Sequence, residues 1–175
     1  MDLIRLTAEY ELKPFDCGDT DLNGFLMNDA KRFAETKIAN TFLLEEDGRI
    51  IAYFCLLNDK VSKQDMTNGT WRKVKKKFPH EKHFSSYPSI KIGRFAVSLN
   101  YKGQGIGCKI MLFLKYMLHE ENAYSAFRFL TVDAYLSAIP FYIKNDFELL
   151  IPDDDNEHTR MMYFDMIYLS SMKGT

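Results

Sequence analysis

The residues best suited to chemistry in this chain lie in a glycine-rich loop between a predicted strand and a predicted helix. The loop reads Lys102-Gly103-Gln104-Gly105-Ile106-Gly107. Its glycines allow backbone conformations that other residues avoid, so several N–H groups at the start of the following helix can point outward. Together with the positive end of the helix dipole, these groups predict a site for a phosphate or a diphosphate.

Two common phosphate-binding loops do not match this segment. A P-loop requires Gly-Lys followed by Ser or Thr after a four-residue gap, and the fifth position after Gly103 is Cys108. A dinucleotide-binding loop started at Gly103 also ends on Cys108, and one started at Gly105 ends on Ile110. The sequence therefore excludes both motifs and leaves a shorter loop of the form Arg/Gln-x-x-Gly-x-Gly/Ala.

This shorter loop resembles the pyrophosphate loop of the GNAT N-acetyltransferase superfamily, with Lys102 where Arg or Gln is usual. A second segment, Ser137–Phe147, resembles the Ala-x-x-Phe-Tyr-x-x-x-Gly-Phe segment of the same superfamily. It has Asn145 and Asp146 in place of the glycine, and both residue types tolerate the left-handed conformation that glycine supplies. The resemblance implies that acetyl-CoA is the cosubstrate.

The N-terminal part of the chain carries a narrower resemblance. The run Phe15–Leu26 is similar to the Phe-x-Cys-Gly-x-x-x-Leu-Asn-x-Phe-Leu opening of one branch of the superfamily, which includes the tRNA-acetylating toxins of bacterial toxin–antitoxin pairs. Two further segments match the branch in position: Arg94-Phe95-Ala96-Val97, and the basic segment Lys60–Lys82 before that strand. The resemblance implies aminoacyl-tRNA as a substrate and a ribbon-helix-helix antitoxin as a partner, with a homodimer kept as a candidate assembly.

The resemblance also implies roles for individual residues. Tyr142 becomes the proton donor to the departing thiolate, because a phenol with a reference pKa of about 10 stays protonated near neutrality. An alternative interpretation of Tyr142 is an aromatic side chain that only packs against Phe141 and Phe147. The expected acetyl-CoA contacts are made by Phe95, Ala96, Val97, Lys102, Gly103, Gln104, Gly105, Ile106, Gly107 and Phe141.

The absence of a general base from the central strand indicates which class of amine accepts the acetyl group. No Glu lies between Ile90 and Ser98, so the strand offers no evident general base. An α-amino group, with a reference pKa of about 7.7–8.0, needs a base less than a lysine side chain does at about 10.4. The sequence therefore favours an α-amine, and a basic segment could hold a polyanionic carrier through its phosphates. The tentative substrate contacts are Arg94, Lys73, Lys75, Lys76 and Lys77.

Other interpretations stay open. The lysines could form the solvated side of an amphipathic helix whose buried face carries Trp71, Val74 and Phe78. The enzyme could acetylate a small-molecule amine, or the chain could be a catalytically silent acyl-CoA-binding module. A zinc site is not indicated, because His80 and His83 have no Cys cluster or third ligand nearby, and no metal is expected.

Composition predicts one globular domain over residues 1–175. The chain is 46% hydrophobic with a formal net charge of −1, and no run approaches the roughly 20 apolar residues of a membrane helix. Its three cysteines are odd in number and lie in apolar or helical contexts, as expected of reduced thiols in the cytoplasm.

The elements that must position these residues follow from periodicity and turn signals. They predict an α+β (α/β) fold with a mixed, mostly antiparallel twisted sheet flanked by helices. The superfamily resemblance implies a central parallel strand pair that splays around acetyl-CoA. The expected strands are Leu3–Thr7, Thr41–Leu44, Ile50–Leu57, Ile90–Val97, Phe127–Asp133, Phe147–Leu150 and Arg160–Tyr168. Leu3–Thr7 is expected at an edge of the sheet, and the turn Glu46-Asp47-Gly48-Arg49 predicts a hairpin between the second and third strands. The expected helices run from Asp19 or Asp21 to Glu35, around Trp71, over Gly105–Glu121, and onward from Ser137 as a cap. Apolar residues at helical spacing predict the first and third of these helices: Leu22, Phe25, Leu26, Ala30 and Phe33 in the first, and Ile110, Met111, Leu114 and Met117 in the third.

Overall fold

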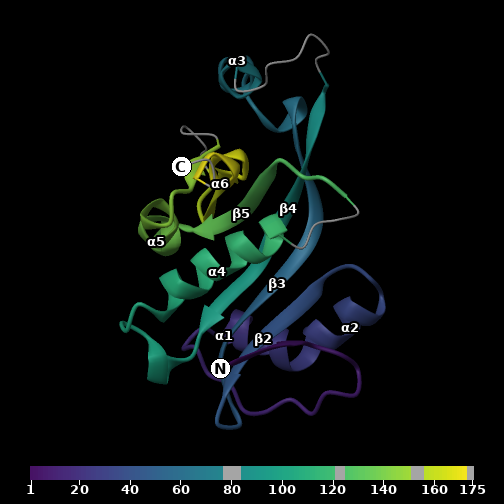
Figure 1. Ribbon diagram of the computed structural model, residues 1–175, viewed down its shortest axis with the longest axis vertical. Coiled ribbons are helices and arrows are strands. Elements are labelled where there is room, and N and C mark those ends of the chain that lie inside the picture. Colours follow the sequence, from purple (N-terminus) through teal and green to yellow (C-terminus); the bar gives the residue numbers. More distant parts are fainter. Residues whose placement is uncertain (77–83, 121–124, 151–155, 173–175) are drawn as a thin grey trace. The chain divides into compact units, whose positions relative to one another are not determined.

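A computed structural model describes residues 1–76, 84–120, 125–150 and 156–172 (Figure 1). Its strands form one mixed sheet in the order β1-β2-β3-β4-β5-β7-β6, with β4 and β5 as the parallel pair. No helix among the described residues is long and apolar enough to cross a membrane. The chain divides into two compact units, Met1–Leu57 with Ile92–Met111, and Asn58–Lys91 with Leu112–Thr175.

The first unit contains the N-terminal elements and the glycine loop. Its elements are β1 (Asp2–Arg5), α1 (Thr20–Gly24), the π-helical turn η1 (Phe25–Asp29), α2 (Ala30–Glu35), β2 (Asn40–Glu46), the first part of β3 (Arg49–Ser62), the last part of β4 (Ser86–Val97), the 3-10 turn η3 (Leu99–Tyr101) and the start of α4 (Ile106–Glu120).

The predicted hairpin and edge strand are both confirmed. Strand β2 pairs antiparallel with β3, and β1 pairs antiparallel with β2 at the end of the sheet. Asp47 and Gly48 have φ angles of 49° and 73°, the left-handed conformation that a tight hairpin turn requires. The predicted N-terminal helix is confirmed too, with Asp19 as its cap, although η1 interrupts its middle.

The core of the first unit is closed by the N-terminal helix. Phe25, Leu26 and Ala30 are each 6% exposed or less and pack with Leu43 and Tyr53. These helical residues follow the predicted apolar stripe, so burial of that stripe explains why the helix lies on the sheet. The Tyr53 hydroxyl donates to the Leu22 carbonyl at 2.7 Å, which satisfies its only polar atom inside the core.

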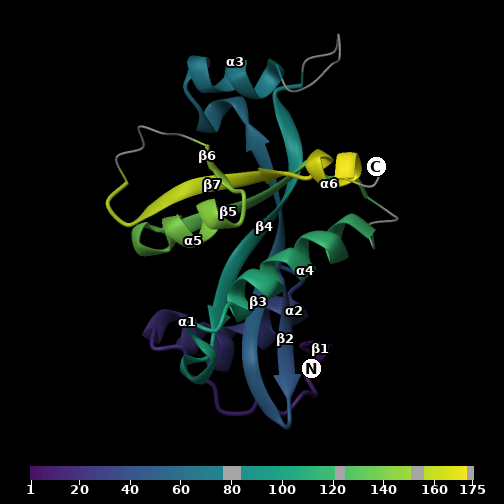
Figure 2. The same cartoon turned by 60° about the vertical axis from the view of Figure 1, so that its left-hand side comes forward.

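The second unit contains the remaining helices and the C-terminal strands. Its further elements are the 3-10 turn η2 (Lys63–Asp65), α3 (Asn68–Lys76), β5 (Phe129–Tyr135), the 3-10 turn η4 (Leu136–Ala138), α5 (Ile139–Lys144), β6 (Glu148–Leu149), β7 (Thr159–Asp165) and α6 (Ile167–Met172). Figures 1 and 2 both show α5 beside β5, with which it is in contact.

The core of the second unit confirms the predicted face of the short basic helix. Trp71 and Val74 are 3% and 4% exposed and pack with Tyr87, Phe129 and Tyr163. The predicted third member of that face, Phe78, lies outside the described residues.

Several boundary predictions are wrong. The strand expected over Ile50–Leu57 continues to Ser62 as β3, and the strand expected from Ile90 begins at Ser86 as β4. Ser137 does not cap α5: it lies inside η4, and the N-cap position is Ala138, with a proline at the start of the helix. Proline there lacks an N–H, so one group that would need a cap is missing. The last strand ends at Asp165 rather than Tyr168, because the Asp165 carboxylate accepts a hydrogen bond from the Ile167 N–H as α6 begins.

Candidate active site

The predicted phosphate loop is an open backbone turn at the N-terminus of α4. Gly103 and Gly105 have φ angles of 76° and 75°, which side chains other than glycine rarely adopt. A Cβ at either position would meet no atom within 4 Å, so backbone conformation rather than crowding requires these glycines. The Lys109 N–H donates to the Gly105 carbonyl at 3.2 Å, and the helical ladder starts there. The N–H groups of the first turn precede that ladder.

A network from the N-terminal motif anchors the start of this loop. The Leu99 N–H donates to the Asp16 carbonyl at 2.9 Å, and the Lys102 ammonium donates to the Cys17 carbonyl at 2.5 Å. The Asn23 amide oxygen accepts from the Cys17 N–H at 2.9 Å, while its nitrogen donates to the Asp16 carboxylate at 2.8 Å. The Lys102 ammonium is therefore hydrogen-bonded to the protein's own backbone, whereas a lysine at this position predicted a contact with the ligand.

This network explains the Phe-x-Cys-Gly-x-x-x-Leu-Asn spacing in physical terms. Gly18, with a φ angle of 78°, turns the chain so that Asn23 on α1 can reach back to Asp16 and Cys17. Burial raises the pKa of the Cys17 thiol above its ordinary value, so it stays protonated at neutral pH. Cys17 thus packs and donates a hydrogen bond to Asn23 at 3.1 Å instead of acting as a nucleophile.

The central strand β4 leads directly into the loop. Ala96 is buried, while Phe95 and Val97 are partly exposed. Arg94, a tentative substrate contact, is held within its own unit: its Nε lies 3.5 Å from the Asp21 carboxylate and its guanidinium lies 5.2 Å from the centre of the Phe25 ring.

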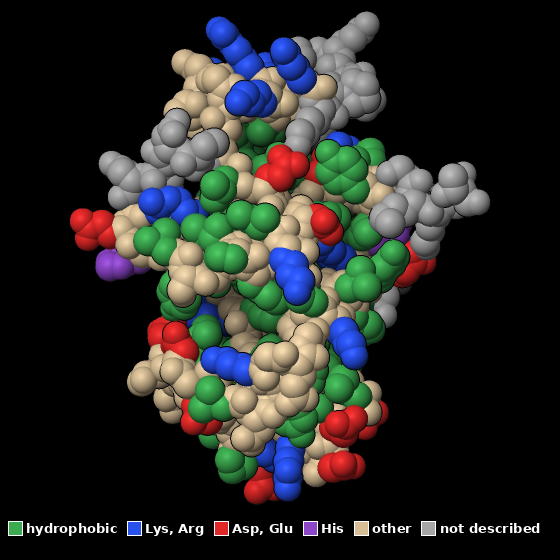
Figure 3. Space-filling view, turned by 90° about the vertical axis from the view of Figure 1, so that its left-hand side faces the viewer, with side chains coloured by type: hydrophobic (Ala, Val, Ile, Leu, Met, Phe, Trp, Pro, Cys, Tyr) green, Lys and Arg blue, Asp and Glu red, His purple; other side chains and the backbone are tan. Residues whose placement is uncertain are grey.

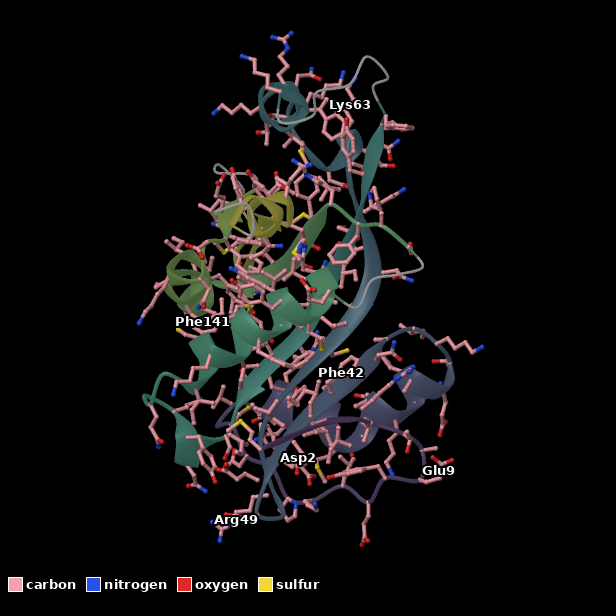
Figure 4. The ribbon with its side chains drawn as sticks, viewed as in Figure 1. Asp2, Glu9, Phe42, Arg49, Lys63 and Phe141 are labelled. Carbon is pink, nitrogen blue, oxygen red and sulfur yellow. The ribbon has the colours of Figure 1, made fainter. Side chains whose placement is uncertain are left out.

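Tyr142 and Phe141 belong to the second unit and lie on α5, where Figure 4 labels Phe141. Tyr142 is 6% exposed, and its ring packs edge-on against Phe141 and Phe147 at centroid distances of 5.2 and 5.3 Å. Burial raises the pKa of its phenol, so the hydroxyl holds its proton throughout the neutral range. The packing interpretation and the proton-donor interpretation are therefore compatible, because the same contacts fix the ring and keep it protonated.

Three residues around Tyr142 complete this cluster. Asp146 has a φ angle of 63°, which confirms that the Asn145-Asp146 pair supplies the left-handed turn in place of glycine. The Phe147 N–H and the Asn145 N–H both donate to the Tyr142 carbonyl at 3.0 Å. Lys115 of α4, which residue-type reasoning overlooked, lies beneath this turn. Its place one helical turn after Met111, on the apolar face of α4, is compatible with burial but does not identify its partner.

The basic helix α3 presents its lysines on the side away from the core. Lys73 and Lys76 are exposed and Lys75 is partly exposed, whereas Lys77 lies outside the described residues. Figure 3 shows Lys and Arg side chains gathered over this helix, and Figure 4 places Lys63 close to it. A hollow of about 410 Å³ in the same unit is lined by Lys60, Ser62, Lys63, Gln64, Ser85 and Ser86.

The predicted site residues thus fall into two groups. Phe95–Val97, Arg94 and the glycine loop belong to the first unit, whereas Phe141, Tyr142 and the lysines of α3 belong to the second. Among the residues that the structure describes, no three His, Cys, Asp or Glu side chains are grouped so that they could hold a metal ion.

Comparisons with known proteins agree with this chemistry. The sequence model of the acetyltransferase (GNAT) family matches residues 5–147. A search of curated proteins found no match. Similar solved structures include a Tyr→Phe mutant of KacT, with a TM-score of 0.77, 22% identity and coverage of 98% of this chain and 99% of that chain.

Two structures of AtaT are also similar. One is AtaT complexed with acetyl-methionyl-tRNAfMet, with a TM-score of 0.77, 22% identity and coverage of 98% and 99% of the two chains. The other is a Tyr→Phe mutant of the toxin AtaT bound to the C-terminus of the antitoxin AtaR and acetyl-CoA, with a TM-score of 0.74, 21% identity and coverage of 99% and 98%. These likenesses establish the fold.

Proposed function

The chain belongs to the acetyltransferase (GNAT) family, and from this premise we propose that it transfers the acetyl group of acetyl-CoA to the α-amine of an aminoacyl-tRNA. The observation that carries the proposal is the Lys102–Gly107 loop, whose two left-handed glycines open the backbone at the N-terminus of α4. Such a backbone binds a diphosphate through its N–H groups and the helix dipole, which fits the diphosphate of coenzyme A.

The proposed reaction forms a carbon–nitrogen bond, breaks the carbon–sulfur bond of the thioester and transfers one proton to the sulfur. The neutral amine attacks the thioester carbonyl carbon, the carbon–sulfur bond breaks, and the amine proton passes to water. A backbone N–H of Phe95–Val97 polarises the carbonyl oxygen. The Tyr142 hydroxyl gives its proton to the departing thiolate and afterwards takes one back from water. Its burial supports this role because the phenol stays protonated at neutral pH.

The tRNA part of the proposal rests on α3. Its exposed side chains offer Lys73, Lys75 and Lys76 to phosphates, and Lys60 and Lys63 line a hollow in the same unit. The similar toxin AtaT has been solved with acetyl-methionyl-tRNAfMet, which supports this substrate class. We therefore propose that the protein is a toxin neutralised by a small ribbon-helix-helix antitoxin, in line with the AtaT–AtaR complex. The proposal also includes a cytoplasmic location and a homodimeric assembly.

Turnover of acetyl-CoA with aminoacyl-tRNA tests the proposal. We expect wild-type protein to acetylate the α-amine, and Tyr142→Phe to lower kcat by about 10²–10⁴-fold while its KM for acetyl-CoA stays within about twofold. Binding of acetyl-CoA without transfer to any amine would show a silent binding module instead.

A charge-neutralising variant tests the substrate class. Replacing Lys73, Lys75 and Lys76 with Gln should raise the KM for aminoacyl-tRNA at least about tenfold and reduce its salt dependence, because about three phosphate contacts are lost. Acetylation of a small amine should be unchanged. A matched control replaces three exposed cations elsewhere, Lys37, Arg49 and Lys144, and should leave both substrates unaffected. Equal losses on both substrates in the α3 variant would count against the nucleic-acid substrate.

A further inference from the structure

Lys115 is a cation inside the core of the second unit. It lies on α4, and its residue is 3% exposed. Its ammonium donates to the Asn145 carbonyl at 2.5 Å and lies 3.7 Å from the centre of the Phe164 ring and 5.3 Å from that of Phe147. It also lies 3.6 Å from the carboxylate of Asp146, whose side chain is 82% exposed.

A buried ammonium needs a reason, because removing it from water costs free energy that an exposed carboxylate only partly offsets. Burial accordingly lowers the pKa of Lys115, and Asp146 opposes that shift. Lysine is rarely found fully buried, and an apolar side chain of the same length would fill this position without that cost. What lysine supplies and an apolar residue does not is a donor for the Asn145 carbonyl.

The Asn145 carbonyl belongs to the turn that fixes Tyr142. The Asn145 N–H donates to the Tyr142 carbonyl at 3.0 Å, and the Asn145 side-chain amide donates to the Phe141 carbonyl at 2.8 Å. The Phe147 N–H also donates to the Tyr142 carbonyl at 3.0 Å, and the Phe147 ring packs against that of Tyr142. Lys115 therefore contacts two residues, Asn145 and Phe147, that both donate backbone hydrogen bonds to the Tyr142 carbonyl.

We propose that Lys115 is a positioning residue for the Tyr142 phenol: by binding the Asn145 carbonyl and the face of Phe147, it locks the last turn of α5 and the direction of the Tyr142 ring. The inference rests on the proposed function, because it assigns Lys115 to the proton donor of that reaction. The competing account is that Lys115 only stabilises the fold, and the two accounts predict different kinetics.

A double-mutant cycle separates them. Lys115→Met keeps the length of the side chain and removes the donor. We expect kcat to fall about 10- to 100-fold, the loss that misplacing a reacting group by about 1 Å produces, with the KM for acetyl-CoA unchanged. In a Tyr142→Phe background the same substitution should change kcat by less than about twofold, since the group it positions is already gone. Lys144→Met, an exposed lysine on α5, is the matched control and should match wild type in kcat.

The folded state is checked by thermal unfolding of each variant, and Lys115→Leu replaces Lys115→Met in the cycle if the latter does not fold. Leucine also removes the donor to the Asn145 carbonyl, and loss of kcat confined to the Tyr142-containing background again supports positioning. A kcat equal to wild type, or the same fold-loss in both backgrounds, overturns the inference. If wild type transfers no acetyl group, the proposed function fails first and separately. If wild type and Tyr142→Phe transfer it equally fast, the assignment of Tyr142 as proton donor fails, and the inference about Lys115 fails with it.

Discussion

Burial determines the acid–base behaviour of Tyr142. The side chain is enclosed by Phe141 and Phe147, and the loss of water raises the pKa of the phenol because the charged phenolate is disfavoured. A general acid must carry its proton when the thiolate leaves, and a raised pKa guarantees that at every physiological pH. The acceptor amine has the opposite requirement, since it must lose its proton before it can attack.

The rate of acetyl transfer should therefore depend on the titration of one group only, the acceptor amine. Between about pH 6 and pH 8 the rate of acetyl transfer should rise as the α-amine, with a reference pKa of about 7.7–8.0, becomes neutral. Above that range it should stay level to about pH 10, because a pKa raised above the ordinary tyrosine value of about 10 keeps Tyr142 protonated. Single-turnover rates on aminoacyl-tRNA measure this profile. A decline above pH 8 that is absent from Tyr142→Phe would contradict it.

The two neighbours, Tyr142 and Lys115, show what residue patterns can and cannot reveal. Tyr142 could be predicted because it stands in a Phe-Tyr pair at a recognisable distance from the loop. Lys115 could not, because its partner Asn145 is 30 residues away and only the packing of α4 against that turn brings them together. A lysine on an apolar helix face is ordinarily taken to extend along the surface into water.

At the scale of elements, the glycine loop can be tested by backbone strain alone. Gly103→Ala and Gly105→Ala each force a side chain into a left-handed conformation with free space around it, at a cost of about 1–3 kcal/mol. Relief of that strain should move the loop away from its binding shape, so the dissociation constant for acetyl-CoA should rise roughly tenfold or more. Calorimetric titration measures this change.

Gly48 provides the matched control for the loop glycines. It has a φ angle of 73° and open space around its Cβ position, but it lies in the turn between β2 and β3. Gly48→Ala should therefore lower stability by a similar amount and leave acetyl-CoA affinity unchanged. Weaker binding in all three variants would show that general destabilisation, rather than loop shape, explains the loss.

The network at the start of the loop leads to a second element-scale prediction. Asn23 contacts Asp16 and Cys17, which in turn hold Leu99 and Lys102. Asn23→Ala should weaken acetyl-CoA binding several-fold, although Asn23 lies outside the loop. Without the Asn23 amide, the Asp16 and Cys17 carbonyls that anchor the start of the loop are held less firmly. The exposed Asn28→Ala is the control. Equal affinities for the two variants would show that the loop holds its shape unaided.

The elements themselves were largely predictable where local chemistry decides them. The β2–β3 hairpin followed from Asp47-Gly48, and α4 from its apolar period after the loop, within a residue of the observed start. Where tertiary contacts decide, prediction failed. The π-helical turn η1 has no residue signature of its own, and the strand that was extended to Tyr168 ends at Asp165 because that carboxylate pairs with Arg128 and caps α6.

At the scale of the whole molecule, charge is balanced overall and uneven locally. The formal net charge is −1, yet exposed lysines gather on α3. If the proposed tRNA substrate is correct, its phosphates bind at this local face, because a net charge near zero gives the protein little overall attraction to a polyanion. This distribution suits an enzyme that holds one phosphate-rich carrier at one place and is not attracted to nucleic acid all over.

Cooperativity is the final property that the structure predicts. Three elements, β3, β4 and α4, run without interruption from one compact unit into the other. Unfolding either unit alone would break the hydrogen-bonded ladders of these elements, so we expect one two-state transition over residues 1–175, with equal calorimetric and van't Hoff enthalpies.

Acetyl-CoA at about 100 times its dissociation constant should add about 2.7 kcal/mol to the free energy of unfolding and raise the midpoint by roughly 5–10 °C without splitting the transition. Differential scanning calorimetry measures both quantities, and Gly105→Ala, which binds acetyl-CoA weakly, should show a smaller shift at the same ligand concentration. Two separate transitions, only one of which responds to acetyl-CoA, would instead mean that the chain comprises two domains and that one of them binds the cosubstrate alone.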